Sequence, residues 1–371
     1  MVFLFLLIIP LLVATTAFLA FNKKIVWFEF LIQIAAQIAI AGICCGIMYW
    51  SNTSDVEIWN GHVTAKKSEK VHCRHDYCCG YCKSCSRDSK GNESCHEYCC
   101  RTCYYHDYDI DWLFWTTDTG ERSVSTIDWQ GLREPPRWTQ VVIGEPTASS
   151  HSYTNYIKAA PDSLFRDQGL VEKFKTELPK YPGEVYDYYR IHRIVSVLPS
   201  LNNNAEWNQA LSDLNSRLNP AKEVNAILVV TSKKPHDYFQ ALRQHWMGGK
   251  KNDVVLVIDI NDDLAIDWVD VMAWTDHKEF EVKLRDSIKD LQTLDLHNPK
   301  QVMQPFENAI SQYYVRKHMK DFKYLKASIT PSITQWIVCL IIGFLSSIGI
   351  SWYMVVNDVD EASLKRYRRY R

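Results

Sequence analysis

The chain has 371 residues, of which 47% are hydrophobic and 23% are charged, and its formal net charge is -1. This composition excludes an intrinsically disordered chain and a globally basic nucleic-acid-binding protein. The length predicts roughly two or three domains, and the mean hydropathy of -0.23 is typical of a soluble protein. The apolar residues are concentrated near the two ends, however, so this average describes no single region.

Two apolar runs occupy residues 1–50. Residues 2–21 carry no charged side chain, and residues 25–50 carry only Glu29. About 20 apolar residues are enough for a helix to cross a bilayer, so each run predicts a transmembrane helix. A cleaved signal peptide is the alternative for the first run. Such a peptide normally begins with a basic segment, whereas Lys23 and Lys24 follow this run, so we favour an uncleaved span.

A third transmembrane helix is predicted within residues 331–356. Residues 333–356 carry no charge and include Trp336 and Trp352 near their ends, as in the aromatic belt of a membrane interface. A basic tail follows at residues 357–371. With three spans, this tail lies on the same side of the membrane as Lys23 and Lys24.

The basic flanks predict the orientation. Cytoplasmic segments are enriched in lysine and arginine, so the tail is predicted to be cytoplasmic, against anionic lipid, and the middle of the chain extracytoplasmic. Five basic residues before the third span favour the opposite orientation: Arg316, Lys317, Lys320, Lys323 and Lys326. Large domains translocate largely regardless of charge, so we retain the first orientation.

Nine of the 12 cysteines lie between positions 73 and 103, within a predicted small Cys-rich β module at residues 51–150. Cys79 with Cys82, and Cys100 with Cys103, form two C-x2-C pairs joined by a turn-rich link. This is the spacing of a tetrahedral zinc site. Further residues could serve a second metal: Cys73, Cys78, Cys85, Cys95, His72, His75, His96 and His106.

Disulfides are the alternative for the same cysteines. Dense cysteine in an oxidising compartment usually forms them, and the predicted orientation fits that compartment. Because nine is odd, at least one thiol would stay unpaired or join another chain. The twin spacing favours zinc and the orientation favours disulfides, so both alternatives stay open. Either one would stabilise a segment that is too poor in apolar residues to form its own core.

After the cysteines, residues 109–128 predict a β-hairpin around an Asp-Thr-Gly turn. From about residue 163, strand and helix patterns alternate. Apolar runs predict strands near Ile194 and over 224–232 and 253–260, with a half-exposed strand near 266–274. Helical periodicity marks residues 171–178, 207–218, 235–246, 280–291 and 302–314. This alternation predicts a three-layer α/β domain over residues 151–330.

The strand AILVVTS, the helix HDYFQALRQHW, the turn MGGKKND and the strand VVLVIDI together resemble the TPM domain. The resemblance covers residues 185–315 and implies an α/β fold found in membrane-anchored, extracytoplasmic proteins. The segments HDYDIDW, SYTNYIKAAPDSLF and VRKHMKDFKYLK also resemble membrane proteins of large tailed bacteriophages, a likeness that implies the host inner membrane but no biochemical activity.

Some TPM-type domains bind divalent cations or act as acid phosphatases. The resemblance therefore draws attention to Asp259, Asp262 and Asp263, which follow a strand at the edge where α/β sheets bind ligands. Their oxygens would suit calcium or magnesium. The alternative, which we favour, is an Asn- and Asp-rich turn between two strands. The segment DWVDVMAW replaces the glycine-rich strand of the family, which argues against an inherited activity.

The sequence therefore predicts a mixed α+β and α/β membrane protein with three transmembrane helices, a Cys-rich β module and a TPM-like domain. No P-loop, nucleophile elbow, HExxH or dinucleotide motif is present, and no catalytic residue is predicted. We expect a non-enzymatic protein that contacts the lipid bilayer and a protein partner at the host envelope, but no nucleic acid. The alternative is a divalent-cation-dependent phosphatase or other hydrolase that uses the loop at 259–267.

Overall fold

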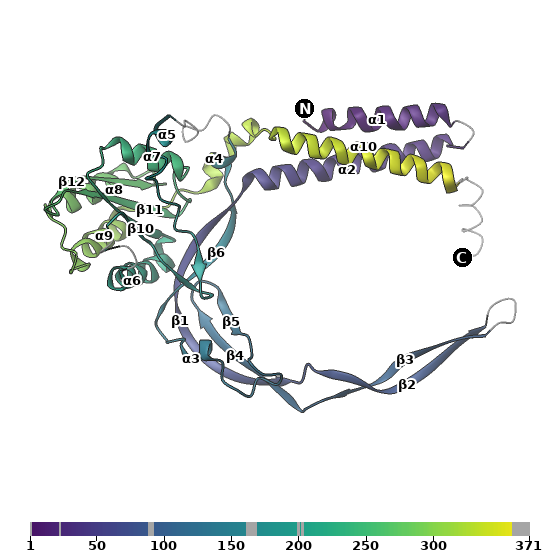
Figure 1. Cartoon of the computed structure of the whole chain (residues 1–371), viewed down its shortest axis with the longest axis horizontal. Helices are drawn as coiled ribbons and strands as arrows, with labels where there is room; N and C mark the ends of the chain where they lie inside the picture. Colours follow the sequence, from purple (N-terminus) through teal and green to yellow (C-terminus); the bar gives the residue numbers. More distant parts are fainter. Residues whose placement is uncertain are drawn as a thin grey trace. The chain divides into compact units, whose positions relative to one another are not determined.

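The computed structural model describes residues 2–21, 24–87, 93–160, 169–198, 201 and 204–357 (Figure 1). It has a mixed α/β fold, as the sequence predicts, and forms two compact units. The first unit comprises Met1–Asp55, Ser152–Arg166 and His318–Arg371, and the second comprises Val56–His151 and Asp167–Lys317. Lys23 and the basic tail beyond Asn357 lie outside the described residues.

The first unit contains three helices that are long and apolar enough to cross a membrane, as predicted: α1 (Val2–Ala20), α2 (Trp27–Thr53) and α10 (Ile333–Asn357). They pack against one another through small and aliphatic side chains, among them Leu6, Ala41 and Cys339. Polar bonds also join them. Gln33 Nε2 donates to Ser351 Oγ over 2.7 Å. Such bonds satisfy polar groups that hydrocarbon would leave without a partner. The short helices α4 (Tyr156–Ala159) and η2 (Met319–Ser328) complete the unit.

Close packing of α10 on α1 depends on Gly343. A Cβ atom at this position would lie 2.8 Å from Cγ of Pro10, whereas a Cβ at Gly349, on the same helix, would meet nothing within 4 Å. We expect Gly343→Ala to destabilise the detergent-purified protein by about 1–3 kcal/mol, which lowers its melting temperature. Gly349→Ala is the matched control and should leave it unchanged or raise it. Equal melting temperatures for the two variants would contradict this account of the packing.

In the second unit, one sheet has the strand order β5-β4-β1-β6. Its strands are β1 (Ser54–His72), β4 (Tyr108–Thr116), β5 (Gly120–Val124) and β6 (Pro146–Thr154), and the one-turn helix α3 (Pro136–Thr139) lies beside it in the chain. The predicted hairpin is present as β4 and β5, with Gly120 at a φ of +80° in the turn. Val63, Trp112 and Phe114 pack in the core of this sheet. The sequence did not predict the 19-residue strand β1.

A separate two-stranded ribbon extends from this sheet (Figure 1). It consists of β2 (Asp76–Arg87) and β3 (Glu93–Tyr104), paired antiparallel, and we call it the arm. Nearly every residue of β3 is exposed, so the arm has no apolar core of its own. A two-stranded ribbon of this kind is at best marginally stable in water, so other bonds must hold it together.

The other half of the second unit has three layers. Its sheet has the order β12-β11-β10-β9, in which β9, β10 and β11 are parallel and β12 is antiparallel. The strands are β9 (Ile194–Ser196), β10 (Asn225–Ser232), β11 (Asp253–Ile260) and β12 (Ile266–Ala273). Helices α6 (Ala205–Lys222), α8 (Lys278–Lys289) and α9 (Lys300–Tyr313) cover one face. Helices α5 (Gly169–Phe174) and α7 (Asp237–His245) cover the other.

These layers follow from the sequence patterns. Successive residues of β10, such as Leu228 and Val229, pack against opposite helical layers. Both faces of the strand are therefore buried, which explains its apolar sequence. The helix marked by Val171 ends at Phe174, earlier than the periodicity predicted. A short hairpin, β7 (Val185–Tyr186) and β8 (Arg190–Ile191), precedes β9.

Buried polar bonds join the β1 sheet to the three-layer half. The Glu57 side chain on β1 is fully buried and accepts bonds from Arg316 over 2.9 Å and from Lys251 over 3.1 Å. Asn252 Nδ2 donates to the backbone oxygen of Ile58 over 2.7 Å. The two halves therefore form one unit through charged and amide groups as well as apolar contact.

Candidate metal centre

Eight of the nine clustered cysteines are paired across the arm as disulfides: Cys78–Cys99, Cys79–Cys103, Cys82–Cys100 and Cys85–Cys95. Of the two alternatives for Cys79, Cys82, Cys100 and Cys103, the structure therefore has the disulfides. The physical reason is the extended backbone. Antiparallel strand pairing brings the cysteines of β2 next to those of β3, so each of these four sulfurs meets a sulfur of the facing strand rather than its C-x2-C partner.

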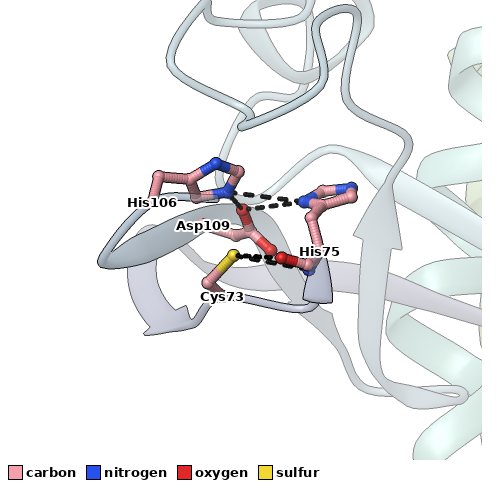
Figure 2. A group of neighbouring side chains, drawn as sticks. All are labelled: Cys73, His75, His106 and Asp109. Atoms are coloured by element: carbon pink, nitrogen blue, oxygen red, sulfur yellow. Dashed lines mark hydrogen bonds and ion pairs between the residues drawn. The ribbon is translucent and has the colours of Figure 1, made fainter. Parts of the chain in front are cut away.

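Cys73 is the ninth cysteine of the cluster, and it is a free thiol that is only 2% exposed. It lies beside three other side chains that can bind a metal: His75, His106 and Asp109. One potential ligand atom from each of the four lies within 4.8 Å of the others. Figure 2 shows the two imidazole rings on either side of the Asp109 carboxylate, with the Cys73 sulfur close to the backbone of His75.

The four residues come from the two chain segments that join the arm to the sheet. Cys73 and His75 lie between β1 and β2, while His106 lies in the bend after β3 and Asp109 lies in β4. Pairing of β1 with β4 sets Asp109 opposite Val71, two residues before Cys73. The cluster is therefore located at the root of the arm.

The distances within the cluster are short. His75 Nδ1 is 3.4 Å from His106 Nε2 and 3.4 Å from Asp109 Oδ1. His106 Nε2 contacts the same carboxylate oxygen directly. The backbone N–H of His75 donates to Cys73 Sγ over 3.3 Å, and the Cys73 thiol can donate to the His75 carbonyl oxygen over 3.4 Å. Three of the four candidate ligand atoms thus converge on one point.

Neighbouring groups hold the ligands in place. The backbone N–H of Arg74 donates to Asp109 Oδ2 over 2.8 Å, which turns the other oxygen towards the histidines. Trp129 packs against His75, with ring centroids 4.6 Å apart. Burial raises the pKa of Asp109, but the bonds from Arg74 and His106 and the charges of both histidines together lower it below its usual value. The carboxylate is therefore charged at neutral pH.

A thiol, two imidazoles and a carboxylate are the groups that zinc and related transition metals bind. Four protein ligands fill a tetrahedral site, which is typical of a structural rather than a catalytic metal. In the described residues a second group, Cys85, Glu93 and Cys95, is equally close, but its two sulfurs are bonded to each other. Comparisons with protein-family models, curated proteins and solved structures find no match to this chain.

Sequence reasoning found this site in part. It named Cys73, His75 and His106 among the residues available for a second metal, but it assigned Asp109 to a strand and did not consider it as a ligand. The spacing of His106 and Asp109, three residues apart, was the local signal. That signal is weak by itself because the two partners from the β1 end become neighbours only through strand pairing.

The acidic loop forms a turn. Asp259 is buried and accepts bonds from Thr231 Oγ1 over 2.7 Å and from the backbone of Lys234 over 3.0 Å, and burial raises its pKa. Asn261 Oδ1 accepts from the backbone of Asp263, as in an Asx turn. Asp262 forms an ion pair with Lys233. Across the described part of the chain, no close group of metal-binding side chains includes these aspartates, so nothing observed favours calcium or magnesium there.

Proposed function

We propose that the protein is a non-enzymatic membrane protein that presents the arm and the three-layer half to a partner protein outside the cytoplasm. The observation that carries this proposal is the arm itself: an exposed ribbon without a core, held by four disulfides within the described residues. A long exposed ribbon contributes no apolar core to the fold, so contact with another molecule is the role that its exposure and its dense cross-linking suit best. The resemblance to phage membrane proteins suggests the host envelope as the place.

The disulfides support the orientation. They form and persist in oxidising compartments and are rare in the cytosol. This favours an extracytoplasmic second unit, anchored by α1, α2 and α10 if these helices cross the membrane, with the basic tail on the cytoplasmic side. A reporter that is active only outside the cytoplasm, fused after Arg371, tests the topology. We expect it to be inactive, and activity there would reverse the orientation.

The surface of the arm suits a protein partner better than a nucleic acid. Its four basic residues are balanced by four acidic ones over residues 76–104. Tyrosine is enriched in protein interfaces, and five large aromatic side chains are exposed on the arm and beside it: Tyr77, Tyr81, Tyr98, Tyr104 and Tyr105. Such a balanced, tyrosine-rich surface lacks the positive charge that nucleic-acid binding requires.

Photo-crosslinking from the arm tests for the partner. We expect a photoreactive phenylalanine analogue at position 81 to yield one discrete protein adduct in host membranes. The matched control is position 324, because Tyr81 and Tyr324 are both 71% exposed but Tyr324 lies in η2 of the first unit. The adduct should disappear when the arm disulfides are reduced, since the partner is expected to bind the ordered ribbon.

Two outcomes would contradict the proposal. One is equal labelling from positions 81 and 324, which would indicate random collision. The other is an adduct that persists after complete reduction, because binding would then not depend on the folded arm.

A further inference from the structure

We propose that Cys73, His75, His106 and Asp109 bind one zinc ion at the root of the arm. The inference deepens the proposed function, because such an ion would fix the direction in which the arm is presented. Zinc binding itself does not require that the arm has a partner, so the two proposals can fail separately.

Two spacings between the ligand atoms already fit a tetrahedral zinc ion, whereas His106 Nε2 and Asp109 Oδ1, now in direct contact, would move apart to admit it. Protein ligands lie about 2.0–2.3 Å from zinc, so the ligand atoms of a tetrahedral site are about 3.3–3.7 Å from one another. Both distances from His75 Nδ1, to His106 Nε2 and to Asp109 Oδ1, are 3.4 Å. All four ligand atoms already lie within 4.8 Å, so small side-chain movements complete the tetrahedron.

The same converging atoms can share protons or give lone pairs to a cation. His75 Nδ1, His106 Nε2 and Asp109 Oδ1 converge, and the carboxylate oxygen can accept an N–H from both rings when these nitrogens are protonated. A zinc ion accepts a lone pair from each of them. On binding, Cys73 loses its thiol proton to solvent, and the thiolate together with the Asp109 carboxylate balances the two positive charges of the metal. The half-buried site is then neutral.

Zinc also accounts for a thiol that stays free beside eight oxidised cysteines. A thiolate attacks disulfides and reshuffles them. Cys73 is buried, and its sulfur already accepts the His75 backbone N–H. Coordination would keep this sulfur unprotonated yet unavailable for exchange. The arm could then oxidise to its four native pairs without competition from the ninth cysteine.

The ion would link the two chain segments that join the arm to the sheet. Each segment supplies two ligands, and a backbone bond from Tyr105 N to the oxygen of His75, 3.1 Å long, already joins them. Because the arm has no apolar core, the bonds at its root are what fix its angle to the β1 sheet. Zinc at this position therefore acts as a structural clamp.

The test is the zinc content of the full chain, purified in detergent without reductant or chelator. The protein is dialysed first against buffer with zinc and then against buffer without zinc, so that only bound zinc remains. We expect one zinc per chain in the wild type, and a content lower by more than about tenfold in Cys73→Ser and in Asp109→Asn. His96→Ala is the matched control, because His96 is an exposed histidine on the arm. The double variant Cys82→Ser and Cys100→Ser removes one disulfide but none of the four ligands. Both controls should retain the zinc.

Cobalt provides a second readout. Co²⁺ in place of zinc should give a thiolate-to-metal absorption band in the wild type and in His96→Ala, and no such band in Cys73→Ser. Thiol counting in denaturant checks that the disulfides of each variant are formed. Zinc that persists in Cys73→Ser but is lost from the double variant would overturn the proposal in favour of the C-x2-C pairs. Absence of zinc from the wild type after dialysis would overturn it outright.

Discussion

Replacing Glu57 with alanine is expected to lower the free energy of unfolding of the second unit by about 3 kcal/mol. The Glu57 side chain is fully buried and pairs with Arg316 and Lys251, whose side chains are 9% and 17% exposed. Removing one partner of a buried ion pair leaves charges in a medium that solvates them poorly, which typically costs about 3–5 kcal/mol. We expect the lower end of this range, because Glu223 also contacts Arg316.

Chemical denaturation of the full chain measures this loss, with hydrogen-exchange protection of the β10 and β11 amides as the readout of unfolding. Glu307→Ala is the matched control. Glu307 accepts two bonds from Arg217, at 3.0 and 2.6 Å, but these side chains are 32% and 54% exposed. An exposed pair contributes about 0–1 kcal/mol. Similar losses for Glu57→Ala and Glu307→Ala would show that burial of the Glu57 pair does not decide its contribution.

Reducing the disulfides is expected to unfold the arm while the rest of the second unit stays folded. The sequence separations of the bonded cysteines range from 10 to 24 residues. Each cross-link of this size contributes about 2–4 kcal/mol by restricting the unfolded chain. Without them, an exposed two-stranded ribbon is marginal in water. No apolar core compensates for the loss, because β3 is exposed along nearly its whole length.

Hydrogen exchange with and without a reductant measures this effect. Amide protection of β2 and β3 should fall to that of an unstructured chain, while β11 at Asp253–Ile260, in the buried three-layer half, should keep its protection. Thiol counting establishes that reduction is complete. Retained protection of the arm after complete reduction would mean that strand pairing alone stabilises it.

The sequence predicts the three-layer half well because its signals are local. Strands β10 and β11 are continuous apolar runs, and Leu211, Leu214 and Leu218 repeat at helical spacing on α6. Each pattern requires only that one face, or both, be buried. The helix near Val171 ends at Phe174 and is shorter than predicted. Leu178 still packs on the same apolar cluster as Phe174, so the apolar spacing reports burial there and not helix length.

Strand β1 escaped prediction for the opposite reason. Its second half carries Lys66, Lys67 and Lys70, is largely exposed, and has no apolar alternation. It is a strand because β4 pairs with it over residues 63–72. That pairing is non-local, so no window of sequence around β1 contains the signal. Strands β2 and β3 also lack a local signal, because each is a strand only through its pairing with the other.

At the candidate metal centre, the sequence by itself determined the odd number of clustered cysteines, the spare thiol that follows from it, and the supply of histidines nearby. Only the tertiary structure decided that Cys73 is the unpaired thiol and that Asp109 faces His75 and His106. The reason is the strand register. Antiparallel pairing of β2 with β3 pairs eight cysteines across the arm, and pairing of β1 with β4 brings Asp109 beside the segment that carries Cys73.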